Sequence, residues 1–209
     1  MVPSESDSDP PEIARMLERL ATGDDSVWPE LLRMYDGYLH RLLSARLDTR
    51  LNRRFDMLDL IQETHLQLTR RIQDYLERRP MPFKLWVRAT ACQCVMQQYR
   101  KHVQAQARSV GREQHATDQS SVLLARQLID SMTSPSGKAA NREESERVMQ
   151  AVGNLSESDR EVLLLRTYEG LTNAEASRVL EIEQDACRKR YTRALLRLRE
   201  SMRVDPDTH

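Results

Sequence analysis

The chain has 209 residues, 39% of them hydrophobic and 31% charged, and its 32 basic side chains are matched by 32 acidic ones. This composition is polar for a single globule, and the 6 Gly and 8 Pro, without β-branched clusters between turns, argue against a sandwich or a barrel. No apolar run is long enough to cross a membrane and the N-terminus shows no export signal, so we expect a cytoplasmic protein.

The zero net charge hides alternating blocks along the chain. Basic side chains predominate over residues 31–112 and 188–209, whereas acidic ones predominate over 1–30 and 113–187. Two basic blocks separated by an acidic stretch suggest two contacts with a polyanion. At this point the alternative is a set of Arg-rich helices whose charged faces are simply solvated.

A polar tail and two helices are expected at the start of the chain. Residues 1–11 are rich in Ser, Asp and Pro, a composition typical of a disordered tail. Apolar residues at helical spacing, beginning with Ile13 and ending with Leu20, then predict a short amphipathic helix. A second helix is predicted over about 27–47, before a basic connector at 50–54.

Two longer helices complete the first predicted domain. Apolar residues spaced four and three apart predict a helix over about 56–78, which a Pro-Met-Pro segment ends. Another helix begins near Phe83 and extends to about residue 106. Because these helices carry apolar stripes that can face one another, we expect a small helical bundle over residues 12–108.

The composition changes over residues 109–140. Polar stretches there flank one short apolar helix at about 122–132, and a Ser-Pro-Ser-Gly helix breaker follows it. We therefore expect a flexible linker over 109–140 and a second helical domain over 141–203.

The second domain contains a helix-turn-helix pattern over residues 155–201. A short helix at about 172–179 is followed by a three-residue turn and by a long basic helix at about 184–201. Such a pair is typical of a motif whose second helix enters the major groove, where Arg can pair with guanine and Gln with adenine. An ordinary helical hairpin with a solvated basic face is the alternative. The candidate DNA-contacting residues are Gln184, Asp185, Arg188, Lys189, Arg190, Thr192 and Arg193.

Local signals define the ends of these helices. Ser156 can cap one helix, with Asp159 closing a capping-box-like exchange, and Thr172 with Glu175 forms a second capping box. The turn of such a motif often carries Gly where a positive φ is needed, and Glu181 occupies that position. A non-Gly residue at positive φ costs roughly 1 kcal/mol or more, unless the turn avoids that conformation.

These residues resemble a known family. The segment LSESDREVLLLRTYEGLTNAEASRVLEIEQDACRKRYTRALLRLRE looks like region 4 of bacterial sigma factors of the extracytoplasmic-function (ECF) group of the sigma-70 family. Independently, the segments LLRMYDGYLHRLL, FDMLDLIQETHLQL and FKLWVRATACQCVMQQYRKH look like sigma region 2. The resemblance covers nearly all of residues 12–201, in the family's order. It implies an all-α protein with a region 2 bundle, a linker and a region 4 helix-turn-helix.

The resemblance assigns a docking role to the acidic helix of the first domain. In the family this helix binds the RNA polymerase core, and the residues that match it here are Asp59, Gln62 and Glu63. They fall about one turn apart on one helix face, so they can meet a basic partner together. Taken alone, the same three residues would describe a solvated face.

The resemblance also implies that the first domain opens and reads the −10 promoter element. Opened strands need a basic groove with aromatic or amide groups. Trp86 fits a core position better than a stacking position. Gln93 stands where the family often has an Asn that contacts a flipped base, and Cys92 and Gln97 also depart from the family pattern, so the base preference is not implied. The candidates are Phe83, Lys84, Trp86, Arg88, Gln93, Gln97, Arg100 and Lys101.

The implied function is that of a dissociable subunit. It would bind the beta and beta-prime subunits of the polymerase core and direct promoter-specific initiation, with the helix-turn-helix reading the −35 element. Family members are commonly held by an anti-sigma factor, although no residue pattern here identifies one. The residues alone leave open a stand-alone helix-turn-helix regulator that binds DNA without polymerase.

Enzymatic chemistry is not indicated by any motif. The sequence contains no phosphate loop, no zinc-ligand spacing and no nucleophile–base set, so we expect no catalytic residue, metal or cofactor. The three cysteines, Cys92, Cys94 and Cys187, are interpreted as small core hydrophobes in a reducing cytosol.

Overall fold

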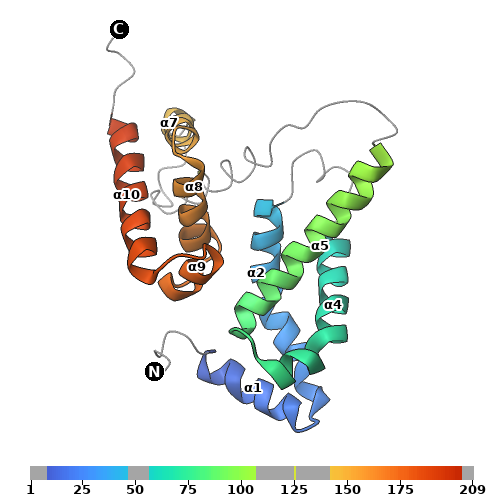
Figure 1. Cartoon of the computed structure of the whole chain (residues 1–209). Helices are drawn as coiled ribbons and strands as arrows, with labels where there is room; N and C mark the ends of the chain where they lie inside the picture. The colour runs from blue at the N-terminus through green and yellow to red at the C-terminus, as the bar shows by residue number, and fades with distance from the viewer. Residues whose placement is uncertain (1–8, 47–56, 107–124, 126–141, 204–209) are drawn as a thin grey trace. The chain divides into compact units, whose positions relative to one another are not determined.

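The computed structural model describes residues 9–46, 57–106, 125 and 142–203, and all regular structure within these ranges is helical. The chain divides into two compact units, Met1–Ala116 and Thr117–His209 (Figure 1). The predicted all-α fold with two small helical domains is therefore confirmed. The predicted basic connector at 50–54 lies outside the described residues, as does the linker apart from Ala125, which is helical and buried.

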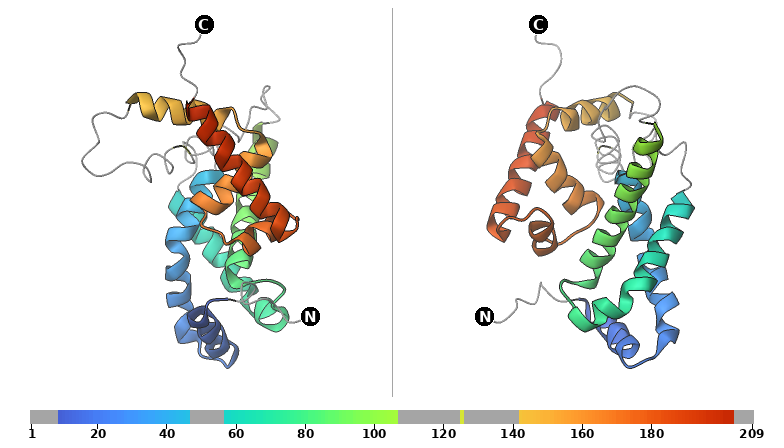
Figure 2. Two further views of the ribbon diagram at one scale, coloured as in Figure 1. Left: turned by 90° about the vertical axis from the view of Figure 1, so that its left-hand side faces the viewer. Right: turned by 45° about the vertical axis from the view of Figure 1, so that its right-hand side comes forward.

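The first unit is a bundle of α2, α4 and α5, with α1 across one end. Figures 1 and 2 show the three long helices side by side, and α1 contacts α2 and α4. Amphipathic stripes explain the packing, because α4 buries residues at intervals of three and four along one face. The elements are α1 (Pro11–Ala21), η2 (Asp25–Val27), α2 (Trp28–Arg46), α4 (Met57–Arg78) and α5 (Phe83–Gln106).

The start of the first unit differs from the prediction. α1 begins at Pro11, because proline suits the first helical position, where its missing N–H has no partner to lose. Just before it, the Asp9 carboxylate accepts a hydrogen bond of 2.6 Å from the backbone N–H of Phe83 at the start of α5. The predicted tail over 1–11 is therefore too long at its C-terminal end, and its first eight residues lie outside the described part of the chain.

Phe83 lies at the centre of an aromatic core. Its side chain is fully buried, and its ring centroid lies 5.2 Å from that of Tyr35, 5.5 Å from Tyr75, 5.5 Å from Trp86 and 6.4 Å from Trp28. Aromatic pairs at such separations add about 0.5–1.5 kcal/mol beyond the area they bury. This cluster joins α2, α4 and α5 into one core.

The second unit holds the helix-turn-helix. α10 packs against α7, α8 and α9, and Figures 1 and 2 show α8 and α10 side by side, with α9 near one end of both. The polypeptide between α8 and α9 forms a single π-helical turn, η3, before Gly170 at φ +67°. The elements are α7 (Arg142–Gly153), α8 (Glu157–Leu163), η3 (Leu164–Tyr168), α9 (Asn173–Val179) and α10 (Gln184–Arg203).

The predicted caps are present, with one difference. Thr172 and Glu175 form a complete capping box at α9, with each side chain bonded to the other residue's backbone N–H. Ser156 accepts a hydrogen bond of 3.2 Å from the backbone N–H of Asp159, as expected. The carboxylate of Asp159, however, is paired with Arg197 of α10, so the second half of the exchange at α8 is replaced by a link between helices.

Glu181 does adopt a positive φ, of +54°. The N–H of Ile182 donates to the carbonyl of Ser177 at 3.0 Å, and the N–H of Glu181 donates to that of Arg178 at 3.3 Å. These two bonds form a Schellman motif, which requires a left-handed residue directly after the helix C-cap. The turn therefore satisfies the last carbonyls of α9 at the expense of backbone strain at Glu181.

Replacing Glu181 with glycine is expected to stabilise the second unit by about 1 kcal/mol, because glycine adopts positive φ without steric cost. Hydrogen exchange of the α9 and α10 amides in the full chain would measure the gain. Glu183→Gly is the matched control, since Glu183 is exposed in the same turn and is not at positive φ. Equal effects of the two changes would contradict this account of the turn.

Candidate nucleic-acid and protein-binding surfaces

α10 has one face packed against the rest of the second unit and an opposite face exposed to solvent. Cys187, Ala194 and Leu198 are buried against the rest of the second unit. Of the seven candidate DNA-contacting residues, Arg190 is half-buried and six are exposed: Gln184, Asp185, Arg188, Lys189, Thr192 and Arg193. Four of these, Arg188, Lys189, Thr192 and Arg193, line one shallow depression in the surface. The solvent face can therefore present three cations and a hydroxyl together.

Two contacts order the N-terminal end of α10. The Asn173 side chain at the start of α9 donates a hydrogen bond of 2.9 Å to the backbone carbonyl of Gln184. One turn into the helix, Arg188 donates to the Asp185 carboxylate at 2.8 Å, and both side chains stay exposed. Asp185 therefore acts on the position of Arg188, a role that was not evident when it was predicted as a DNA contact.

The remainder of the second unit holds α10 in place. Asp159 of α8 is 4% exposed and bonds to Arg197 of α10. The Arg166 guanidinium lies 5.3 Å from the ring centre of Tyr191 and donates to the carbonyl of Leu171. A buried carboxylate and a cation–π contact of this kind orient the helix as well as stabilising it.

The acidic residues of α4 lie on an outer face with two leucines. Asp59 and Gln62 are exposed, and the partly buried Glu63 accepts a hydrogen bond of 2.7 Å from Gln67. Leu58 is 63% exposed and Leu66 is 43% exposed, close to these polar residues in the helix. Sequence reasoning missed both leucines, although they lie off the buried stripe of α4. We refer to Leu58, Asp59, Gln62, Glu63 and Leu66 as the α4 surface.

The candidates on α5 divide into core and surface. Phe83 is 0% exposed and Trp86 is 6% exposed, so neither ring is available to DNA in this conformation. Rings from α2, α4 and α5 surround Phe83, so its selection as a DNA contact is wrong for this conformation, whereas Trp86 stacks on Tyr75 and has the core position that the sequence favoured for it.

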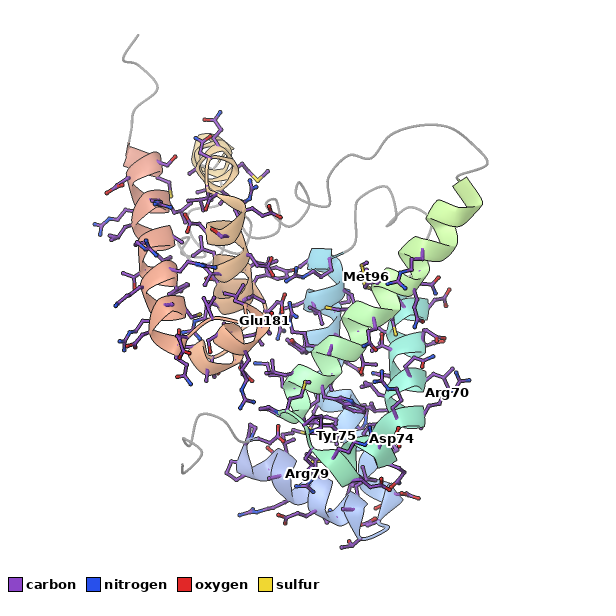
Figure 3. All side chains as sticks on the ribbon, viewed as in Figure 1. Arg70, Asp74, Tyr75, Arg79, Met96 and Glu181 are labelled. Carbon is purple, nitrogen blue, oxygen red and sulfur yellow. The ribbon has the colours of Figure 1, made fainter. Side chains whose placement is uncertain are left out.

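Five α5 candidates are at least partly accessible. Lys84 places its ammonium 5.5 Å from the ring centre of Tyr38, and Arg88 is also partly exposed. Gln93, Gln97 and Arg100 are exposed, whereas the side chain of Lys101 lies outside the described part. Met96 lies among them at 51% exposure and was missed by the sequence analysis (Figure 3).

The buried cysteines behave as core residues. Burial raises the pKa of the Cys94 thiol and of the Cys187 thiol. A raised pKa keeps both groups protonated at neutral pH, where the thiol is a poor nucleophile and a poor metal ligand. Cys92 is half-buried.

Together these features describe a helical protein with a basic, solvent-facing helix in one unit and a mixed acidic and apolar surface on the other. Residues 145–198 match the family model described as Sigma-70, region 4. This match lies within the second unit and agrees with the resemblance to sigma region 4 predicted for it. No helix in the described ranges is long and apolar enough to cross a membrane.

The fold is similar to that of the solved structure of CnrH. CnrH, in its complex with the cytosolic domain of CnrY, aligns with a TM-score of 0.51 and 20% identity over 91% of this chain and 97% of that chain. A chain of the RsbN–BldN complex aligns at 19% identity over 88% of this chain and 97% of its own, with a TM-score of 0.30. Comparison with curated protein sequences gives no match.

Proposed function

We propose that the chain is an ECF-type sigma factor, which binds the RNA polymerase core and directs it to specific promoters. The observation that carries this proposal is the sigma-70 region 4 match at residues 145–198, in a chain whose other unit is a separate helical bundle. A basic recognition helix alone would fit many regulators. The presence of another unit, Met1–Ala116, with an acidic and apolar surface on α4 and a polar, basic face on α5, fits a polymerase subunit better.

Each unit binds a different promoter element. The region 4 domain over 141–203 reads the −35 element with α10, and the region 2 domain over 12–108 opens and reads the −10 element with α5. The residues over 109–140 link the two. The α4 surface docks on the beta and beta-prime subunits, where its carboxylates meet basic side chains and its leucines lose water contact. The chain itself provides no covalent chemistry, because bond formation belongs to the polymerase.

A cytoplasmic location and an inhibitory protein partner follow from this proposal. CnrH was solved in complex with the cytosolic domain of CnrY, and the chain shares its fold over most of its length. We therefore propose that an anti-sigma factor covers the same surfaces that otherwise meet polymerase and DNA.

In vitro transcription tests the proposed function. Purified full-length chain is added to bacterial core polymerase with a pool of templates that carry random upstream sequence, and the transcripts are sequenced. We expect transcripts to share two upstream elements only when the chain is present. Stable core binding without any enriched promoter would overturn the proposal, and tight duplex binding without core would instead indicate a stand-alone regulator.

Replacing Arg188 with alanine is expected to reduce discrimination at one −35 base by about 1–3 kcal/mol, because an Arg paired with guanine contributes that much. The measurement compares holoenzyme binding to promoter duplexes that differ at single −35 positions. Arg199→Ala removes the same charge from an exposed part of α10 and should leave the base preference unchanged. Unchanged discrimination by the Arg188 variant would remove this residue from the reading face.

A further inference from the structure

An exposed hydrogen bond joins α4 to the outer face of α5. The Arg71 guanidinium on α4 donates to the side-chain carbonyl oxygen of Gln93 on α5, with Nη1 and Oε1 2.8 Å apart. Both residues are exposed, and they are 22 positions apart in the sequence. Because Gln93 extends outward on the face that holds Met96, Gln97 and Arg100, its contact with another helix sets the chemistry that this face presents.

The bond fixes the polarity of the Gln93 amide. A guanidinium has only hydrogen-bond donors, so it selects the carbonyl side of the amide. The NH₂ group, bonded to the same carbon, is then directed away from Arg71. Without Arg71, the amide could rotate and offer either its oxygen or its nitrogen to a ligand, whereas with Arg71 it offers two donors.

An apolar side chain lies one turn further along α5. Met96 is 51% exposed and follows Gln93 by three positions, so the two side chains share a helix face. A thioether makes favourable contacts with aromatic rings. The exposed Arg100, four positions after Met96, adds a cation that suits a phosphate. A donor group, an apolar platform and a cation in a row fit one unpaired nucleotide of an opened strand.

We propose that Arg71 is a positioning residue for specificity, which holds the Gln93 amide so that it selects keto bases, thymine or guanine, in the opened strand. The inference rests on the proposed function. Thymine and guanine carry an acceptor oxygen at the position where adenine and cytosine carry an amino group. Two N–H donors can bond to that oxygen and are repelled by the amino group. Met96 supports the face of the same base.

The alternative interpretation is that this contact is an ordinary surface hydrogen bond that adds little to the stability of the fold. Exposed pairs of this kind contribute little or nothing to the free energy of unfolding. Experiments can distinguish the two roles. A stability role would change the unfolding of the chain, whereas a positioning role changes the base that is preferred at one promoter position.

The test reverses the polarity of the amide. In the holoenzyme assembled from the full chain and core polymerase, Gln93→Ala first identifies the −10 position whose base preference depends on this side chain. Arg71→Glu then offers an acceptor in place of donors, so the Gln93 amide should rotate and present its oxygen. We expect the preference at that position to shift by about tenfold from keto bases towards adenine and cytosine. Arg71→Ala should leave little preference between keto bases and the amino bases adenine and cytosine.

Arg70→Glu is the matched control. It makes the same charge reversal at the adjacent exposed position, and Figure 3 shows Arg70 directed away from α5. This variant should keep the keto preference even if it binds promoters more weakly. Transcription with an unchanged preference in the Arg71→Glu and Arg71→Ala variants, both folded by circular dichroism, would overturn the positioning role alone. Absence of any promoter-specific transcript with the unmodified chain would overturn the proposed function itself.

Discussion

Replacing Phe83 with alanine is expected to destabilise the N-terminal unit by about 3–5 kcal/mol, the usual cost of removing a fully buried aromatic side chain. Phe83 is 0% exposed and its ring meets those of Tyr35, Tyr75, Trp86 and Trp28. Such a loss is a large part of the total stability of a small domain. Urea unfolding of the full chain, followed by tryptophan fluorescence, measures it, because both tryptophans lie in this cluster.

The result also decides between two assignments for Phe83. If its ring stacked on DNA bases, the alanine variant would unfold like the unmodified chain and would fail only in promoter opening. Phe83→Leu is the informative second variant, because it keeps a large apolar side chain and should cost less stability than Phe83→Ala, although it loses the ring contacts. A core role therefore predicts that promoter opening by the leucine variant is nearly normal at temperatures where it is folded.

Phe83 shows why the sequence predicted helices better than sites. The start of its helix was correct because helical spacing and the Pro-Met-Pro break are local signals. The side chain was assigned to DNA because aromatic residues suit both a core and a stacking surface. Burial is decided by residues of α2 and α4 that are distant in the sequence, and no local pattern contains them.

The helix caps and Glu181 support the same distinction between local and long-range contacts. Thr172 bonds with Glu175, and Ser156 accepts from the N–H of Asp159; each pair is three residues apart, so spacing predicted these hydrogen bonds. The local sequence also marked Glu181 as the position where such a turn often needs a positive φ, while leaving open a turn that avoids it, and Glu181 does adopt a positive φ. By contrast, the contact between Asp9 and the backbone of Phe83 joins residues 74 positions apart and could not have been predicted from spacing.

The surface candidates were partly predictable. The exposed positions on α10 were predictable, because an amphipathic helix with a basic solvent face leaves a periodic pattern. Arg71 was missed because its role depends on the approach of α4 to α5, which brings it to Gln93. Leu58 and Leu66 were missed because exposed leucines are common on protein surfaces and become informative only beside polar residues on one face.

Replacing Asp59 with arginine is expected to weaken binding to core polymerase by at least about 2 kcal/mol, or roughly thirtyfold, because a charge reversal both removes an attraction and creates a repulsion. Asp59 is exposed on the α4 surface and away from the buried stripe, so the variant should fold normally. Titration of labelled full-length chain with core polymerase gives the affinity directly.

Asp74→Arg is the control for this substitution, since Asp74 is exposed on the same helix but 15 residues, about 22 Å, further along. If α4 docks through its first turns, this variant should bind core as the unmodified chain does. Leu66→Ser distinguishes the apolar from the charged part of the α4 surface. The loss of core affinity caused by Asp59→Arg should shrink as salt is raised, because salt screens exposed charges, whereas the loss of core affinity caused by Leu66→Ser should persist. Core binding that survives Asp59→Arg at low salt would exclude docking through this face, and the carboxylates of α4 would then be no more than a solvated helix surface.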